Sequence, residues 1–304
     1  MSAEMSAKNG AAPVTAESLR SGKGAGDENF PVASALISAP LRPVIFAFYD
    51  FVRAGDDVAD HASLQSDQKY ALLDQLDQSL IGASNAEPLG VRLREKLAER
   101  GLGNRHARDL LDAFRQDVEK NRYATWDELI AYCALSAMPV GRFMLDVHGE
   151  NKKLWPASDA VCAALQINNH LQDCGEDYRD LDRVYVPMDA LAAHGLGVEA
   201  LGAKSASPAL RRCIAELAVR TADLLREGEG LIGEIADWRL RLEISVIHAF
   251  AMRITRLLVV RDPLSEETHL SKWQAGGLAL LAALHGATRG FSPAARPTAS
   301  GSRI

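Results

Sequence analysis

The chain has 304 residues, of which 47% are hydrophobic and 24% are charged, and its formal net charge is −6. This length is enough for one large core or two modest domains. The acidic balance, with no basic run and no recognition motif, argues against a nucleic-acid partner. The four cysteines form no CxxC pair, which is typical of buried thiols in a reducing compartment, and we expect a cytoplasmic protein.

The chain is predicted to begin with a tail and to continue as helices. Residues 1–27 are rich in Ala, Ser, Gly and Lys and lack the continuous apolar core of a secretion signal, so we expect them to be disordered. Nine later segments have apolar residues at three- and four-residue spacing, which predicts helices. They are Leu36–His61, Ser66–Leu80, Pro88–Arg100, Asn104–Lys120, Trp126–His148, Asp159–Asp177, Pro208–Asp237, Leu240–Val260 and Lys272–His285. Ser158-Asp159 and Ser207 are expected to start helices, because they precede apolar-periodic segments and their side chains can cap.

The C-terminal part is less regular. Trp273–Leu284 is the most apolar stretch there; it is too short to span a bilayer, which needs about 18 residues, but could rest on its surface. Residues 291–304 are rich in Pro, Ala and Ser and are expected to be loose. Because strand patterns are almost absent and no long linker divides the chain, residues 28–290 are predicted to form a single all-α domain.

A first polar face is predicted on the segment Leu36–His61. At about 100° per residue, Tyr49, Arg53, Asp56 and Asp60 fall within an arc of roughly 60°, and the neighbouring Asp57 falls outside it. Carboxylate oxygens suit Mg²⁺, and the planar guanidinium of arginine can donate two hydrogen bonds to a phosphate. The alternative is a solvated, salt-bridged helix face, which the apolar residues just before Tyr49 disfavour.

A second polar face is predicted further along the chain. Gln166, Asn169, Asp173 and Asp177 fall within an arc of about 80°, so one amide and two carboxylates lie in a row. Burying such groups without partners costs several kcal/mol. We therefore favour a hard cation, Mg²⁺ first, between the two faces over a purely structural role.

At these residues the sequence resembles the squalene/phytoene synthase family. Tyr49–Asp60 is similar to the first aspartate-rich motif of that family, and Gln166–Tyr185 is similar to the second. Tyr132, followed by Ala137, Val140 and Gly141, resembles a cavity-lining helix between them. The resemblance covers roughly residues 29–260.

Within the family, three stretches are similar to the bacterial hydroxysqualene synthases of hopanoid pathways. These stretches are Asn29–Ser34, Ser136–Arg142 and Asn169–Asp173. Other branches usually have Ile-Leu-Arg before the second-motif aspartate, where this chain has His170-Leu171-Gln172. The neutral side chain of Gln172 argues against a condensing enzyme.

The resemblance implies an isoprenoid-synthase-type helical bundle with a central cavity capped by the two motifs. The implied reaction converts presqualene diphosphate and water into hydroxysqualene and diphosphate, with two or three Mg²⁺ ions and without NADPH. The implied metal ligands are Asp56, Asp60, Asn169, Asp173 and Asp177. The implied substrate-binding residues are Arg53, Gln166, Asn169, Arg183 and Tyr185. The catalytic residues would be Tyr49 and Tyr132, whose rings can stabilise a carbocation, together with Arg53 and the four aspartates.

Several alternatives remain open from the sequence. The enzyme could instead condense two prenyl diphosphates, as presqualene diphosphate, squalene and phytoene synthases do, or the chain could be a non-catalytic assembly or scaffold relative. His170 could line the cavity or pack in the core, and we favour packing. Arg253 could form an ion pair or bind diphosphate. Because the implied product is very apolar, we also expect peripheral membrane contact and work beside other hopanoid-pathway enzymes.

Overall fold

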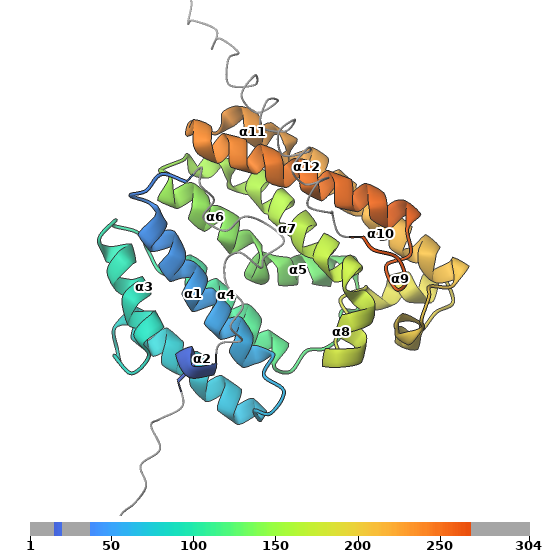
Figure 1. Cartoon of the computed structure of the whole chain (residues 1–304), viewed down its shortest axis with the longest axis horizontal. Helices are drawn as coiled ribbons and strands as arrows, with labels where there is room; N and C mark the ends of the chain where they lie inside the picture. Colours follow the sequence, from blue (N-terminus) through green and yellow to red (C-terminus); the bar gives the residue numbers. More distant parts are fainter. Residues whose placement is uncertain (1–14, 20–36, 269–304) are drawn as a thin grey trace, which may run out of the picture.

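The computed structural model describes residues 15–19 and 37–268, which form a bundle of helices (Figure 1). Within these ranges no strand forms, and one isolated bridge joins Arg122 to Val184. The α-helices are α1 Arg42–Ala59, α2 Ser66–Ile81, α3 Pro88–Ala98, α4 Arg105–Asp117, α5 Trp126–Ser136, α6 Met138–Val147, α7 Trp155–Gln172, α8 Cys174–Leu181, α9 Met188–Ala193, α10 Pro208–Glu227, α11 Leu231–Glu234 and α12 Trp238–Val260. Short 3-10 helices cover Glu17–Leu19, Lys152–Leu154, Val198–Gly202 and Gly228–Gly230. The all-α prediction is therefore confirmed.

Helices α1 to α4 form one half of the bundle. Helix α1 packs against α2, α3 and α4, and α2 and α3 lie at its outer side (Figure 1). The core of this half contains fully buried side chains such as Phe51, Leu73, Leu93 and Leu111. Phe143 of α6 joins this core and stacks on Phe48 of α1, so the two halves meet there.

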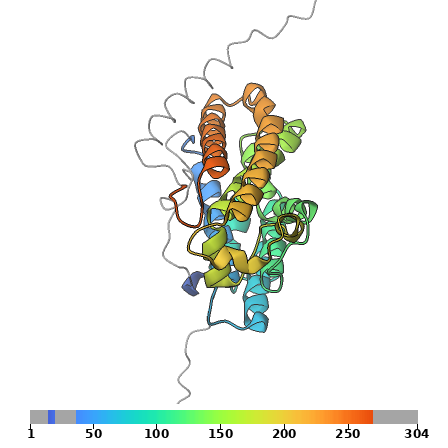
Figure 2. The ribbon, with the colours of Figure 1, turned by 90° about the vertical axis from the view of Figure 1, so that its right-hand side faces the viewer.

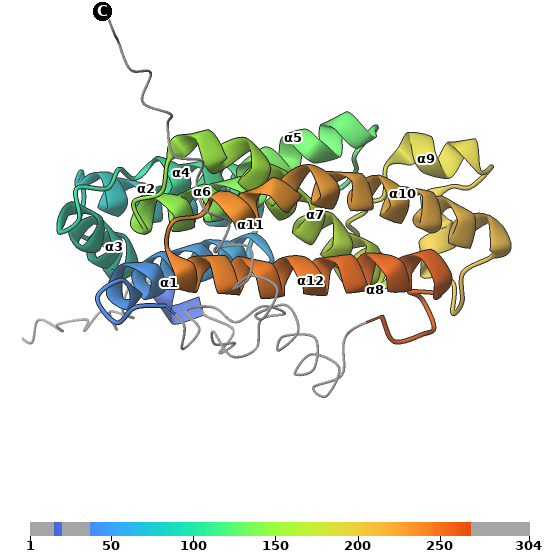
Figure 3. The same cartoon turned by 90° about the horizontal axis from the view of Figure 1, so that it is seen from above.

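Helix α7 is the centre of the other half. It packs against α6, α10 and α12, and α10 and α12 run side by side along the length of the bundle (Figures 2 and 3). Ile167, Leu210 and Ile214 are among the buried residues of this core. Gly141 of α6 faces α7 so closely that a Cβ there would lie 2.4 Å from Ser158 Oγ. The absence of a side chain at Gly141 thus allows the two helices to approach.

Several predicted helix starts are confirmed. Helices begin at Ser66, Pro88, Trp126 and Pro208 as expected. Ser207 caps α10 as predicted, because its Oγ accepts a hydrogen bond from the Leu210 amide at 3.2 Å. Helix α9 was not predicted, because six residues are too few to show a helical period.

Three predicted long helices are wrong because each is interrupted. The segment Trp126–His148 breaks at Ala137, where Pro139 in the first turn of α6 has no amide hydrogen to continue the ladder. The segment Asp159–Asp177 breaks at Asp173, next to Gly175, which packs tightly against Leu264. In the segment Pro208–Asp237, helix α10 ends at Glu227, and a short 3-10 helix separates it from α11.

Other boundaries were also wrong. Helix α7 begins at Trp155 rather than near Ser158, because Pro156 suits the first turn of a helix and supplies an earlier start. The predicted helix Lys272–His285, the apolar stretch Trp273–Leu284, the tail 291–304 and most of the tail 1–27 lie outside the described residues. Trp126–Val147 is long and apolar enough to cross a membrane by length and composition alone, and 44% of that window is buried in the bundle.

Candidate active site

A cavity of about 430 Å³ lies between the two halves of the bundle. Helices α1, α4, α5, α6, α7, α11 and α12 contribute to its wall. Much of the lining is apolar, including Ile45, Phe48, Phe143, Leu231 and Leu240. The predicted residues that line it are Tyr49, Arg53, Asp56, Tyr132, Gln166 and Asn169. The wall therefore carries part of each polar face. Asp60, Asp173 and Asp177 are not among its lining residues, and Asp173 lines a separate, smaller pocket with Gln172 and Thr268.

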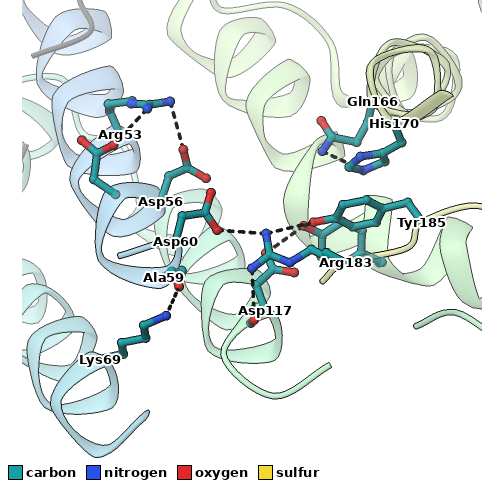
Figure 4. Close-up of polar contacts among 12 residues, drawn as sticks. Arg53, Asp56, Ala59, Asp60, Lys69, Asp117, Gln166, His170, Arg183 and Tyr185 are labelled. Atoms are coloured by element: carbon teal, nitrogen blue, oxygen red, sulfur yellow. Dashed lines mark hydrogen bonds and ion pairs between the residues drawn. The ribbon is translucent and has the colours of Figure 1, made fainter. Parts of the chain in front are cut away.

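The first polar face lies on α1 and carries its own counter-charge. Arg53 Nη1 lies 3.0 Å from Asp56 Oδ2, and Arg53 Nη2 lies 2.9 Å from Asp57 Oδ1 (Figure 4). Asp57, which the helical arc left out, is thus a partner of Arg53. Burial and the nearby charge of Asp60 raise the pKa of Asp56 to about 7, although Arg53 acts in the opposite direction. Because burial and Asp60 disfavour the ionised form of Asp56, a cation beside this carboxylate would stabilise it.

Asp60 follows α1 directly and meets an arginine from the far side of the site. Arg183 Nη1 donates to Asp60 Oδ1 at 2.9 Å, and Arg183 Nη2 donates to the Asp117 carbonyl at 3.2 Å (Figure 4). The Arg183 side chain is only 9% exposed. Asp182, which precedes it, adopts a left-handed backbone with φ 48°, so the chain turns sharply after α8 and brings Arg183 to Asp60.

The second polar face divides between two helices. Gln166 and Asn169 lie on α7, Asp173 is the residue at the break, and Asp177 lies on α8. Burial and the charge of Asp173 raise the pKa of Asp177 to about 7; Arg183 lowers it, and Asp60 raises it further. The effect of the Asp60 charge on Asp177 means that the two polar faces lie close enough to repel each other.

The donor set suits a cation that is shared with a ligand. The Asn169 Oδ1 atom is buried and has no hydrogen-bond partner among the described residues. Within residues 15–19 and 37–268 no three His, Cys, Asp or Glu side chains are arranged to hold a metal by themselves. Pairs of carboxylates with an amide oxygen therefore fit Mg²⁺ only if a bound anion such as diphosphate completes the coordination.

Aromatic rings form the wall behind the carboxylates. Tyr132 donates to Asp117 Oδ2 at 2.8 Å and lies 5.4 Å, between ring centroids, from Tyr185. His170 stacks on Tyr185 with centroids 3.4 Å apart, and its Nε2 lies 3.1 Å from Gln166 Nε2. Burial, and secondarily Arg183, lower the pKa of His170 to about 3, so its ring is neutral. His170 is therefore a packing residue that orients Tyr185 and Gln166, in line with the favoured sequence interpretation.

Two acidic residues near the site were missed by the sequence interpretation. Asp117 ends α4 and is 7% exposed, and burial raises the pKa of its carboxyl to about 7 despite the opposing effect of Arg183. Asp117 lies three residues after Phe114 and seven after Leu110, a spacing that would have placed it on the buried face of α4. Glu243 of α12 is 5% exposed and lines the cavity, and its position among apolar residues of α12 was the available signal.

Comparison with known proteins agrees with this geometry. Residues 24–274 match the family model of squalene/phytoene synthase. A hydroxysqualene synthase of Rhodopseudomonas palustris is 60% identical over 257 residues, which cover 84% of this chain and 88% of that protein. A hydroxysqualene synthase of Zymomonas mobilis is 48% identical over 272 residues, which cover 89% of this chain and 92% of that protein.

Solved structures extend the similarity to the fold. The crystal structure of the squalene synthase HpnC from Alicyclobacillus acidocaldarius has a TM-score of 0.68 and 31% identity, and the match covers 77% of this chain and 89% of that one. A dehydrosqualene synthase in complex with a ligand has a TM-score of 0.75 at 20% identity, covering 86% of this chain and 93% of that one, which supports the fold alone. Together with the family match, these similarities show that the chain belongs to the squalene/phytoene synthase family.

Proposed function

We propose that this protein is a hydroxysqualene synthase, which converts presqualene diphosphate and water into hydroxysqualene and diphosphate. The observation that carries the proposal is the apolar cavity whose wall holds Asp56 of the first polar face and Asn169 of the second. The charge of Asp60 raises the pKa of Asp177, which supports the proximity of the two faces. Relatives named hydroxysqualene synthase, 48% to 60% identical over most of the chain, support the same activity.

The carboxylate faces start the reaction. Asp56, Asp60, Asn169, Asp173 and Asp177 would hold two or three Mg²⁺ ions, which supply the positive charge that stabilises the departing diphosphate. Arg53 and Arg183 are placed to donate hydrogen bonds to the same anion, because both lie among these carboxylates. Gln166 lines the cavity and would orient the substrate there, and Tyr185, which stacks on His170, would contact it at the carboxylates.

The aromatic wall controls the carbocation that remains. Tyr49 and Tyr132 both line the cavity, and a ring face can stabilise a cation by about 0.5–2 kcal/mol. The hydrogen bond from Tyr132 to Asp117 fixes the orientation of the phenol. The apolar walls around it exclude bulk water, so that capture is left to water held at a defined place.

A condensing enzyme and a scaffold fit the chain less well. Gln172, at the position where condensing relatives usually carry arginine, is buried and lies 3.4 Å from Thr268 Oγ1, so it brings no positive charge to a second diphosphate. A scaffold would have no need for Arg53 and Asp56 in the cavity wall, nor for the ion pair between Arg183 and Asp60. We therefore propose catalysis by water capture without NADPH.

The proposed activity is tested with the purified protein, presqualene diphosphate and Mg²⁺ in the absence of NADPH. We expect hydroxysqualene by mass spectrometry, together with one diphosphate released per product. A parallel incubation with farnesyl diphosphate alone should give no product. Product from farnesyl diphosphate, with presqualene diphosphate left untouched, would contradict the proposal and favour a condensing enzyme.

We also propose a cytoplasmic protein that contacts membranes peripherally and works beside other enzymes of hopanoid biosynthesis. The support is chemical, because the proposed substrate and product are too apolar to exchange freely through water. Flotation with anionic liposomes, with and without presqualene diphosphate, tests the contact. Recovery of all protein in the soluble fraction under both conditions would contradict it.

A further inference from the structure

An exposed tryptophan lies next to the apolar part of the cavity wall. Trp238 is the first residue of α12 and is 54% exposed. Leu240, two residues later, is 1% exposed and lines the cavity together with Leu231 of α11. Apart from Glu243, every residue that these two helices bring to the wall is apolar. Figures 1 and 3 show α8, which carries Asp177, near the C-terminal half of α12, so Trp238 starts the end of α12 away from it.

A surface loop lies against the start of α12. Glu150 Oε1 accepts a hydrogen bond from the Asp237 amide at 2.8 Å. A lysine of the same loop forms an exposed salt bridge of 3.0 Å with a glutamate of α11. Residues 150–155 and 231–241 therefore form one continuous surface, which we call the Trp238 patch.

The Trp238 patch lies over a small apolar cluster. This cluster of buried side chains includes Leu154 from the loop, Val161 from α7, Leu231 from α11, Ile235, and Leu240 from α12. Val161, Leu231 and Leu240 also line the cavity. The patch and the apolar part of the chamber therefore share one set of apolar side chains.

The charge of the patch differs from that of the whole chain. The patch has four basic and three acidic side chains, a net charge of +1 (four minus three), in a chain whose net charge is −6. These side chains are Lys152, Lys153, Arg239 and Arg241, and Glu150, Glu234 and Asp237. Glu150 and Asp237 accept hydrogen bonds from backbone amides at the start of α12. Two of the three acidic groups are thus held against the backbone, whereas Lys152 and Lys153 are exposed.

Basic groups lie over the two indole rings of the patch. The guanidinium carbon of Arg239 lies 5.1 Å from the ring centroid of Trp238, and Lys152 Nζ lies 5.0 Å from the ring centroid of Trp155. Neither Arg239 nor Lys152 forms an ion pair within the part of the chain that the structure describes. An indole ring beside a cation combines apolar area with positive charge, and the interface of an anionic bilayer favours both.

We propose that the Trp238 patch docks on the surface of an anionic lipid bilayer and sets the apolar part of the chamber beside it. This inference rests on the proposed function, whose substrate and product are strongly apolar. Tryptophan favours the level of the headgroups, and lysine and arginine are attracted to anionic headgroups. The bilayer then lies beside the walls that hold the prenyl chains, and α8 with its carboxylate lies away from it (Figure 3).

The test measures how the full-length protein partitions onto phosphatidylcholine vesicles with and without phosphatidylglycerol. Trp238→Ala should lower the partition coefficient about tenfold on vesicles that contain phosphatidylglycerol, because the indole no longer enters the interface. Lys152→Gln combined with Arg239→Gln should lower it about tenfold on the same vesicles, because two cations near the anionic surface are lost. On vesicles of phosphatidylcholine alone, the double variant should match wild type.

Matched controls lie at the other end of the same helix. Val260 is 62% exposed, more than Trp238, and Arg253 and Arg256 are exposed arginines of α12. Val260→Ala, and Arg253→Gln combined with Arg256→Gln, should both partition as wild type does. Equal losses in the patch variants and in these controls would mean that overall charge and exposure cause the binding, and would overturn the proposal.

Other occupants of the patch are also tested. A wild-type protein that floats with neither kind of vesicle would overturn the docking. Release by Trp273→Ala alone would assign the contact to the apolar stretch Trp273–Leu284, which lies outside the described residues. A wild-type dimer that dissociates in Trp238→Ala, measured by sedimentation, would make a second copy of the chain the occupant, and would likewise overturn the proposal.

Activity in detergent, without vesicles, separates this inference from the proposed function. Trp238→Ala should form hydroxysqualene from presqualene diphosphate as wild type does, because Trp238 is not among the lining residues of the cavity. If wild type makes no hydroxysqualene but the vesicle results hold, the proposed function is wrong and the docking stands. Hydroxysqualene formation without vesicle binding has the opposite meaning. If Trp238→Ala fails to fold, the double variant of Lys152 and Arg239 decides the test.

Discussion

The two aspartate faces differ in where their positive charge comes from. On α1, Arg53 lies on the same helix as Asp56 and contacts it directly. On the second face, the arginine that offsets the charge of Asp177 is Arg183, which lies beyond the end of α8 and is already bonded to Asp60 of the first face. One face thus has its own counter-charge, whereas the other shares Arg183 with its neighbour.

This difference indicates how the site is held before a ligand arrives. The first face is set by a single unbroken helix, so its geometry depends on local periodicity. The second face depends on the break at Asp173 and on the turn that returns Arg183 to the site. We therefore expect the second face to be the more sensitive one to changes outside its own residues.

The largest expected effect comes from removing one carboxylate from either face. Asp56→Ala and Asp173→Ala should each lower kcat/KM about a thousandfold. Each variant removes a proposed ligand of the Mg²⁺ ions that stabilise the leaving diphosphate. Asp180→Ala is the matched control, since it removes an exposed carboxylate near the second face and should stay close to wild type. Steady-state kinetics of diphosphate release measures all three. If one of the two variants kept near-normal activity, only one face would be needed, which would contradict the prediction that both faces bind the metal.

The next effect tests the shared arginine. Arg183→Ala should lower the free energy of unfolding by about 2–3 kcal/mol, because it leaves Asp60 and the Asp117 carbonyl without their buried donor. Arg179→Ala, an exposed arginine on α8, should change it little. Urea denaturation of the metal-free proteins measures the difference. Equal stability of the two variants would mean that Arg183 does not join the faces.

A smaller effect tests the position of α7, which carries the first half of the second face. Gly141→Ala should destabilise the protein by about 1–2 kcal/mol, because the new methyl group would lie 2.4 Å from Ser158 Oγ and 2.5 Å from Cys162 Sγ. Gly233→Ala has nothing within 4 Å of its Cβ and should be neutral or slightly stabilising. Thermal unfolding separates the two. A neutral Gly141→Ala would show that α7 can shift without strain.

The same contrast explains what the sequence could and could not predict. Periodicity placed Tyr49, Arg53 and Asp56 on one helical face, because α1 runs without interruption through all three. It failed at Asp173, where the assumed single helix is two, because a break set by tertiary packing around Gly175 leaves no signal in the spacing of apolar residues.

Long-range pairs were equally hidden from the sequence. Arg183 was expected to bind substrate, but its bond to Asp60 joins residues 123 positions apart and depends on the left-handed turn at Asp182. The burial of Asp117 is likewise a property of the assembled bundle. The sequence predicts well which residues belong to each face. It does not predict the contacts, such as that between Arg183 and Asp60, that connect the two faces.

The smallest effect concerns Asp117, whose backbone holds Arg183 and whose carboxyl holds Tyr132. Because burial raises the pKa of this carboxyl from 3.8 to about 7, the folded protein keeps a proton there that the unfolded chain loses above about pH 4. Stability from this group is therefore present at low pH and is lost as the pH rises from about 4 to about 7. Asp117→Asn cannot titrate and should lack this loss.

Urea denaturation of wild type and Asp117→Asn between pH 4 and pH 8 measures this contribution as a difference. The free energy of unfolding of wild type should fall relative to the variant by on the order of 1 kcal/mol over that range, since relaxation around a buried charge softens its cost. The acidic groups of the two faces titrate in both proteins, so the difference between the profiles reports Asp117 together with its effect on Asp56, whose pKa the charge of Asp117 raises. Parallel pH profiles would mean that Asp117 is ionised in the folded state. Arg183 would then offset the charge of Asp117 in addition to the charges of Asp60 and Asp177.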